Sequence, residues 1–294
     1  MAGRGVSTVS TIMQKLCQLL VEYLWNETIS KNMPKCQTDL EKKIVDMEEL
    51  WQFPCSWAVL NGCHIPMKCP TPGGLQAFNE YHNYKNFYSI VLMALVDANY
   101  QFVWGSCGFP GNSHDAIISQ STNLWNSIQE GMLPSMHKHV DKLEILPLIL
   151  ADSAFPLRNW LMKPYSNAVL SHIQKFFNYR LSRARMVTEY AFGQLGRWRV
   201  LLRKNEGNMD HVRISVFACM VLHSICIMRG DTISKKLNLT FNHDNNKRRD
   251  REEVRKLLQM RKCQKTTDVS KEAKKIRNAL SDKLWTEKET GKVC

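Results

Sequence analysis

The chain lacks the features that mark zinc-binding, membrane-spanning and secreted proteins. Its ten cysteines include no C-x-x-C pair, which argues against a structural zinc site. The longest apolar stretch, residues 214–228, contains a histidine and two serines and is shorter than the roughly 20 residues that span a bilayer. Polar residues interrupt the apolar positions of residues 1–20, so we expect no secretory signal.

Carboxylates are scarce in one part of the chain. Between Ser153 and Asn205, Glu189 is the only carboxylate, among ten Lys and Arg residues. Asp152 directly precedes this stretch and ends an apolar run, residues 146–151. Solvent-exposed helices normally mix their charges. Because carboxylates hold Mg²⁺ and cations hold a nucleic-acid backbone, the pattern favours phosphoryl-transfer chemistry on a polyanion.

Length and charge narrow the class of protein further. The 294 residues can form one large domain or two modest ones, and 44% of them are hydrophobic. The net charge of +13 favours a polyanionic partner, either nucleic acid or an anionic membrane surface. Since no segment is long enough to span a bilayer, we favour nucleic acid and expect no membrane association.

Three regions differ in their patterns. Residues 1–50 indicate helices, and the segment Gly5 to Met13 is either part of a truncated helix-turn-helix, with Ser7 or Thr8 as N-cap, or an ordinary amphipathic helix, which we favour. Residues 51–230 indicate the main domain. Residues 231–294 hold 18 Lys and Arg against 10 Asp and Glu, a net of +8, and predict a flexible or loosely helical tail. This tail is either simply solvated or a nuclear-import or phosphate-binding segment.

The main domain alternates between strand and helix patterns. Residues 57–60, 87–96, 100–104 and 147–151 are predicted strands, with Asn61-Gly62 as a turn-prone pair, residues 97–99 as a turn and residues 108–112 as a loop. Helices are predicted at residues 115–128, 182–197 and 213–229, besides one at residues 42–51 in the first region. This order predicts an α/β domain with a layered sheet.

Five short motifs occur in a fixed order along the main domain. They are Leu60-Asn61-Gly62-Cys63-His64-Ile65-Pro66, Gly108-Phe109-Pro110-Gly111-Asn112-Ser113-His114-Asp115-Ala116, Ala151-Asp152-Ser153-Ala154-Phe155-Pro156, Phe177-Asn178-Tyr179-Arg180 and Val187-Thr188-Glu189-Tyr190-Ala191-Phe192-Gly193. Each motif is weak by itself, but the ordered set closely resembles the Harbinger transposase-derived nuclease family of the DDE-type superfamily. The resemblance covers residues 50–230.

The resemblance implies a ribonuclease-H-like mixed sheet flanked by helices, a divalent metal cofactor (Mg²⁺ or Mn²⁺) and DNA strand hydrolysis or transfer. It places Asp152 at the second acidic position and Glu189 at the third. At the first position the family has Asp-Gly, whereas this chain has Asn61-Gly62. An amide oxygen can ligate a metal only as a dipole. We therefore expect weak metal binding and a large loss of rate at a site that must hold two dications.

Other residues are weaker candidates. Asp115 is a reserve metal ligand that would replace the missing charge, although it more simply begins a helix. Asp152 could merely cap a turn, and Glu189 could pair with Arg185 one helical turn away. The candidates for phosphate contacts, some of which would instead form salt bridges, are Arg180, Arg183, Arg185, Arg197, Arg199 and Lys204.

Two classes of function remain open from the sequence. One is a metal-dependent nuclease, impaired at Asn61; the other is a catalytically silent DNA-binding or protein-interaction module that keeps the fold. The resemblance also implies DNA and a Myb-like DNA-binding protein as partners. It implies a nuclear location, with the cytoplasm as an additional one.

Overall fold

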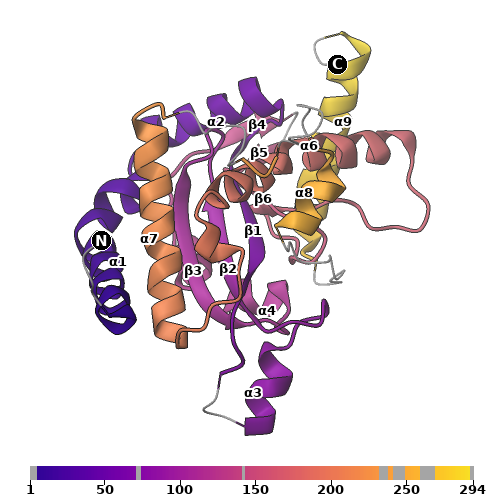
Figure 1. Cartoon of the computed structure of the whole chain (residues 1–294). Coiled ribbons are helices and arrows are strands. Elements are labelled where there is room, and N and C mark those ends of the chain that lie inside the picture. Colours follow the sequence, from indigo (N-terminus) through magenta and orange to yellow (C-terminus); the bar gives the residue numbers. More distant parts are fainter. Residues whose placement is uncertain are drawn as a thin grey trace.

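The computed structural model describes residues 5–70, 74–140, 143–231, 238–240, 249–258 and 269–291. The main sheet has five strands, β1 (Ser56–Pro66), β2 (Ser89–Val96), β3 (Phe102–Pro110), β6 (Leu148–Leu150) and β7 (Leu161–Met162). Their spatial order is β3-β2-β1-β6-β7 (Figure 1). A separate two-stranded ladder consists of β4 (Lys138–Val140) and β5 (Leu143–Ile145).

The sheet is mixed. Strands β1, β2 and β3 form an antiparallel meander, whereas β6 runs parallel to β1, and β7 runs parallel to β6. In the register, Val59 of β1 lies between Val96 of β2 and Leu150 of β6. This arrangement confirms the predicted α/β class and is consistent with a ribonuclease-H-like fold.

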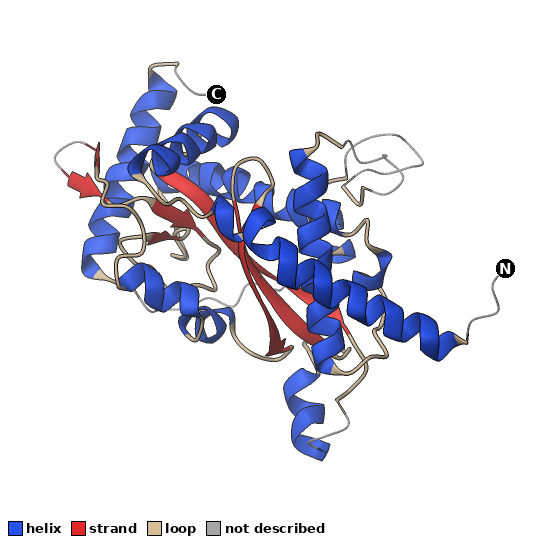
Figure 2. Ribbon diagram, turned by 90° about the vertical axis from the view of Figure 1, so that its left-hand side faces the viewer, coloured by secondary structure: helices blue, strands red, loops and turns tan. Residues whose placement is uncertain are grey.

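Helices cover both faces of the sheet (Figure 2). On one face lie α6 (His172–Leu195), α7 (Met209–Met228), α8 (Arg251–Leu257) and α9 (Lys271–Glu289). On the other lie α4 (Asp115–Gln120), α5 (Asn123–Gln129) and the first half of α2 (Gln37–Trp51). Strand β2 serves both cores, because alternate residues point to opposite faces: Leu92 and Ala94 pack on the α6 side, and Val91 and Met93 on the α4 side.

The apolar run at residues 87–96 forms the fully buried strand β2, as predicted. Two other predictions were wrong in detail. Asn61 and Gly62 do not turn the chain but pair with Ala94 and Met93 of β2 in the middle of β1, because this antiparallel pairing fixes an extended backbone. Strand β3 likewise continues through most of the predicted loop and ends at Pro110.

The predicted helix at residues 115–128 is two helices. The chain leaves α4 at Ser121, and Thr122 then caps α5 by accepting a hydrogen bond from the backbone N–H of Trp125. Helix α6 begins ten residues earlier than predicted. Its start is a capping box, in which Ser171 and Gln174 each bond to the other's backbone N–H.

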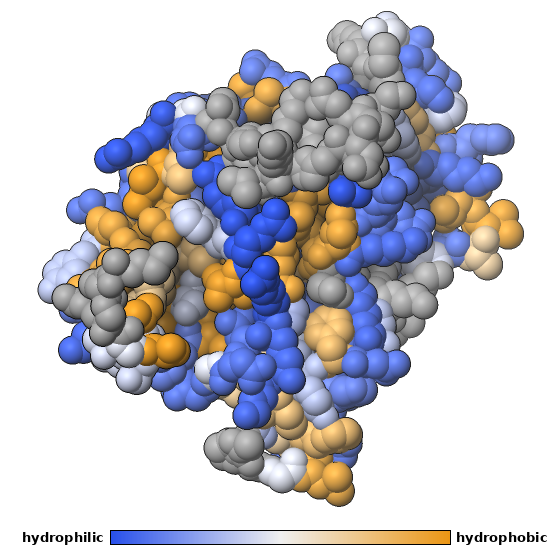
Figure 3. All heavy atoms as spheres, in the orientation of Figure 1, coloured by the Kyte–Doolittle hydropathy of each residue, from blue (hydrophilic) through white to orange (hydrophobic). Residues whose placement is uncertain are grey.

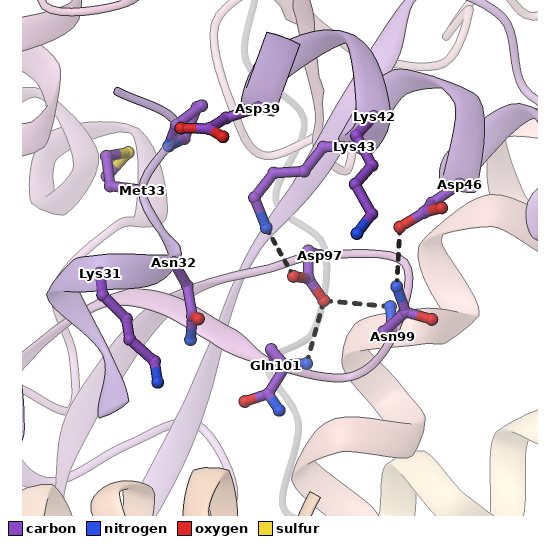
Figure 4. Close-up of a pocket in the computed structure, with 11 residues that line it drawn as sticks. Lys31, Asn32, Met33, Asp39, Lys42, Lys43, Asp46, Asp97, Asn99 and Gln101 are labelled. Carbon is purple, nitrogen blue, oxygen red and sulfur yellow. Dashed lines mark hydrogen bonds and ion pairs between the residues drawn. The ribbon is translucent and has the colours of Figure 1, made fainter. Parts of the chain in front are cut away.

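The turn between β2 and β3 is fixed to α2 by polar side chains (Figure 4). Asp97 accepts hydrogen bonds from the backbone N–H groups of Asn99 and Gln101. The Lys43 ammonium group lies 2.7 Å from the other oxygen of Asp97, and the Asn99 amide donates to Asp46. The predicted turn at residues 97–99 therefore has a specific structural basis.

The N-terminal region begins with an uninterrupted helix, α1 (Val6–Thr28), followed by a short 3-10 helix, η1 (Ser30–Asn32). Gly5, rather than Ser7 or Thr8, occupies the N-cap position. Helix α1 runs unbroken from Val6 through Met13, which agrees both with the amphipathic helix that we favoured and with the second helix of a truncated helix-turn-helix. Helix α1 packs along α7 (Figure 1). Between the two helices the Trp25 and Phe217 rings meet edge to face, with their centroids 5.1 Å apart.

Part of the predicted flexible tail belongs to the folded domain. Helix α9 packs against α6 and buries Ala273, Ile276, Leu280 and Leu284. This 3.6-residue spacing lies within a strongly charged sequence, which is why composition alone predicted a tail. Residues 232–237, 241–248, 259–268 and 292–294, including most of the basic run at 245–249, lie outside the described residues.

Helix α7 is long and apolar enough by composition to cross a membrane. In the structure it lies between α1 and β3, and Val216, Met220, Val221 and His223 are fully buried. The helix predicted at residues 213–229 is therefore a helix that packs in the core of the domain.

Candidate active site

Asn61 lies at the centre of β1 and faces α6. Its side chain is 5% exposed. The amide nitrogen donates to the Thr188 hydroxyl at 3.1 Å, and the amide oxygen accepts from the backbone N–H of Gly62 at 2.9 Å. Both ends of the amide group are therefore engaged.

Asp152 follows the neighbouring strand β6. Since Val59 pairs with Leu150, Asp152 and Asn61 both lie two residues beyond this pair on adjacent parallel segments. One Asp152 oxygen accepts from the backbone N–H of Ala154 at 2.8 Å, and the other lies 3.5 Å from an Arg185 nitrogen. The side chains of both ion-pair partners are less than 10% exposed, so water screens this pair weakly.

Helix α6 brings these contacts together. Arg185, Thr188 and Glu189 lie within one turn and on one helix face, because residues three and four apart are neighbours there. Asp152 contacts Arg185, Asn61 contacts Thr188, and Glu189 is 1% exposed in the same turn. Asp152 and Asn61 therefore each contact a residue of the turn of α6 that also contains Glu189.

The reserve candidate Asp115 lies elsewhere in the fold. It begins α4, whose Ile118 belongs to the apolar core on the sheet face opposite α6. Asn61 faces the α6 side. Asp115 is therefore placed to order the start of α4, and nothing in this arrangement brings it to the turn of α6 described above.

The six basic candidates fall into two groups. Arg180 donates to the backbone carbonyl of Gln52 and is fully buried, and Arg183 bonds to the Gln52 side chain at 2.8 Å. Arg185 and Arg197 pair with Asp152 and Asp231. These four have structural partners. Arg199, in the 3-10 helix η2 (Arg199–Leu201), and Lys204 are exposed, and Arg203 between them is also exposed.

The residues at the turn of α6 only partly fit a divalent metal. Asp152, Glu189 and Asn61 offer two carboxylates and one neutral oxygen, and the Arg185 guanidinium adds a positive charge beside Asp152. In the described ranges, no group of three or more His, Cys, Asp or Glu side chains is placed to hold a metal ion. Two carboxylates can balance one dication, whereas two dications carry four charges. The set therefore fits one ion better than two.

Sequence reasoning missed the role of Thr188. Its hydroxyl accepts from Asn61 and donates to the backbone carbonyl of Arg185 at 2.9 Å, so it links β1 to α6. The Arg185–Asp152 pair was missed as well. Both partners were visible as charged residues in apolar surroundings, but a pairing between residues 33 positions apart needs the fold to be known.

Comparison with known proteins identifies the family of this chain. Residues 60–224 match the family described as DDE superfamily endonuclease. "Protein ALP1-like" of Arabidopsis thaliana is 27% identical over 292 residues, which cover 96% of this chain and 65% of the relative. "Putative nuclease HARBI1" is 26% identical both in Bos taurus, over 58% of this chain and 46% of the relative, and in Homo sapiens, over 60% and 48%.

The chain thus spans between about half and just under two thirds of the length of these relatives. No solved structure matches it. Endonucleases of the DDE superfamily generally use divalent metals. The family match covers more than half of the chain, including Asn61, Asp152 and Glu189. The chain belongs to the Harbinger-derived family of DDE superfamily endonucleases.

Proposed function

We propose that this chain is a nuclease-type DNA-binding protein whose metal-dependent cleavage is strongly impaired. Asn61 is the observation that carries the proposal. It occupies the first acidic position of the family pattern, and its amide group is held on both sides by Thr188 and Gly62. The fold and two acids are kept, while one bridging carboxylate and one negative charge are missing.

Asp152 and Glu189 would hold a divalent ion such as Mg²⁺ or Mn²⁺, with Asn61 as a neutral third ligand. When bound, such an ion polarises a phosphoryl oxygen and lowers the pKa of a water nucleophile. Arg185 holds the Asp152 carboxylate in place, but its positive charge also opposes a dication at the same oxygens. Weak metal affinity is the expected first consequence.

DNA binding is proposed to use the exposed basic segment after α6. Arg199, Arg203 and Lys204 are exposed there, and the chain carries a net charge of +13. Cations at phosphates release counterions, so affinity should fall steeply with salt. A Myb-like partner protein and a nuclear location belong to the same proposal, since both are expected from the family.

DNA binding can be tested across a salt series with two matched variants. Lys204→Glu should weaken binding and reduce the slope of affinity against salt, by about one for each phosphate that the protein no longer neutralises. Lys35→Glu makes the same charge change at an exposed residue before α2 and should have a smaller effect. No affinity at low salt, or equal effects of the two variants, would contradict the proposed surface.

A catalytically silent module is the second candidate. It is favoured by the ion pair between Arg185 and Asp152, which engages one of the two remaining acids. DNA binding without cleavage by either the wild type or Asn61→Asp would support this candidate over the impaired nuclease.

A further inference from the structure

A groove lies between α1, α7 and the segment that contains η2. It has a volume of about 570 Å³. Its apolar walls include Met13, Leu16 and Leu20 of α1 and Val212, Ala218 and Leu222 of α7. Its lining includes none of Asn61, Asp152 and Glu189, whereas Arg199 belongs both to the groove and to the proposed DNA surface.

The apolar surface extends beyond the groove along α1. Met13 and Leu16 are 52% and 46% exposed, and Val9, Ile12 and Leu19 continue the exposed apolar face. Figure 3 shows apolar surface on this side of the molecule, where α1 and α7 lie in Figure 1. An apolar face of this extent on a folded domain marks an interaction surface, and it is too long for a small ligand alone.

The groove also contains polar groups that lack partners. The Arg197 side chain is only 9% exposed, and its Nη1 pairs with Asp231 at 3.1 Å. Within the described part of the chain, Nε and Nη2 of Arg197 and the indole N–H of Trp198 have no hydrogen-bond acceptor. A buried donor without an acceptor is costly. These atoms lie beneath the groove wall, so a ligand acceptor reaches them when the Arg197 or Trp198 side chain turns toward the groove.

The charged residues that line the groove indicate which class of ligand it would bind. Arg197, Arg199 and His211 line the groove, and no Asp or Glu does so in the described ranges. Apolar walls disfavour a nucleic-acid backbone, which needs cations along its whole length. A ligand that carries a carboxylate on an apolar surface would complement both the basic residues and the apolar walls of the groove.

We propose that this groove binds an acidic amphipathic helix of a partner protein. The α1 wall from Ser10 to Leu20 is about 15 Å long, or about three helical turns, which suits a helix with apolar anchors at i, i+3 and i+7. The anchors contact Met13, Leu16 and Leu222, and a carboxylate accepts hydrogen bonds from Arg197 and Trp198. This inference is independent of cleavage, and it shares only Arg199 with the proposed DNA surface.

The test uses synthetic helical peptides and the full chain. One peptide, about 18 residues long, carries leucines at the anchor spacing and glutamates beside them, and a second carries lysines in place of the glutamates. The acidic peptide should bind about tenfold more tightly in fluorescence anisotropy. Leu16→Glu should weaken it about tenfold, whereas the same change at Leu75 of α3 (Gly74–Tyr81), which is 78% exposed, should have no effect.

The Arg197→Gln variant tests whether Arg197 recognises the acidic peptide or only stabilises the fold. It should bring the preference for the acidic peptide from about tenfold to about one, while the circular dichroism of the chain stays unchanged. Equal affinity for both peptides, or no binding of either, would overturn the proposal. DNA binding that Leu16→Glu weakens as much as it weakens peptide binding would also overturn the proposal, as would a dimer of this chain that Leu16→Glu dissociates.

Discussion

The hydrogen bonds around Asn61 depend on its being an amide rather than a carboxylate. The Thr188 hydroxyl uses its only proton to donate to the Arg185 carbonyl, so it can only accept from residue 61. An amide at position 61 donates to it, whereas a carboxylate cannot. The contacts around Asn61 therefore suit an amide. To donate to an aspartate at position 61, the Thr188 hydroxyl would have to give up its hydrogen bond to the Arg185 carbonyl.

Asn61→Asp should consequently be destabilising in the absence of metal. Loss of a buried hydrogen bond should lower the free energy of unfolding by about 1–3 kcal/mol. Mn²⁺ should restore stability, because a ligand that binds only the folded state stabilises it, and by more as its concentration rises above its Kd. Denaturant unfolding with EDTA and with Mn²⁺ measures both effects.

Asn83→Asp is the matched control for this experiment. Asn83 is 2% exposed, donates to the Ser89 hydroxyl at 2.8 Å and lies outside the site. It should lose stability in the same way but gain none from Mn²⁺. Equal recovery of both variants would show that the metal effect does not arise at position 61.

At the scale of elements, apolar patterns predicted β2 and β6 because strands buried on both faces read as continuous apolar runs. Strand β1 was harder to predict. Asn61 and Gly62 prefer turns locally, and only pairing with β2 makes them extended. The candidate acids could be identified from their motifs, but their relation to Arg185 and Thr188 depends on how α6 packs on the sheet.

The loop after β3 gives a prediction at this scale. A Cβ atom at Gly111 would lie 2.8 Å from the backbone oxygens of both Ser89 and Tyr81. Because backbone atoms cannot move aside as a flexible side chain can, Gly111→Ala should lower the free energy of unfolding by about 1–3 kcal/mol. Gly207→Ala, whose nearest neighbour would be a His211 side-chain atom at 3.4 Å, should change it much less. Equal denaturation midpoints for the two variants would contradict this packing.

At the scale of the whole molecule, the sequence predicted the class of domain but placed its C-terminal boundary too early. The basic composition of residues 231–294 hid the apolar face by which α9 covers α6. The charged residues of α9 dominate its composition, whereas its four buried apolar side chains attach it to α6. The composition of all 64 residues from 231 to 294 hides the regular spacing of these few apolar residues, so composition alone did not predict a packed helix.

The stability of the whole chain should depend on His223. Burial and, to a smaller extent, the nearby Arg197 lower the pKa of His223 to about 4, against the hydrogen bond of its ring to the Tyr100 carbonyl at 3.0 Å, which acts to raise it. Between pH 6.5 and about 4 the unfolded chain binds a proton here that the folded chain does not bind. The free energy of unfolding should therefore fall as the pH drops through this window, by at most about 3 kcal/mol.

Replacing His223 tests this assignment. In His223→Gln, the dependence of unfolding free energy on pH should flatten between pH 6.5 and 4, whatever the change in overall stability. Denaturant unfolding at several pH values measures it. An unchanged slope would mean that other groups titrate on acid unfolding.

Cleavage of supercoiled DNA by the wild type and Asn61→Asp, side by side in Mg²⁺ and Mn²⁺, tests the central claim most directly. The account predicts little or no cleavage by the wild type in Mg²⁺, partial recovery at high Mn²⁺, and a clear gain in Asn61→Asp, because the added carboxylate supplies a bridging ligand and a negative charge beside Asp152. Asp152→Asn in the Asn61→Asp background should abolish the gain. Vigorous Mg²⁺-dependent cleavage by the wild type that survives Asn61→Ala and is abolished by Asp115→Ala would contradict the account.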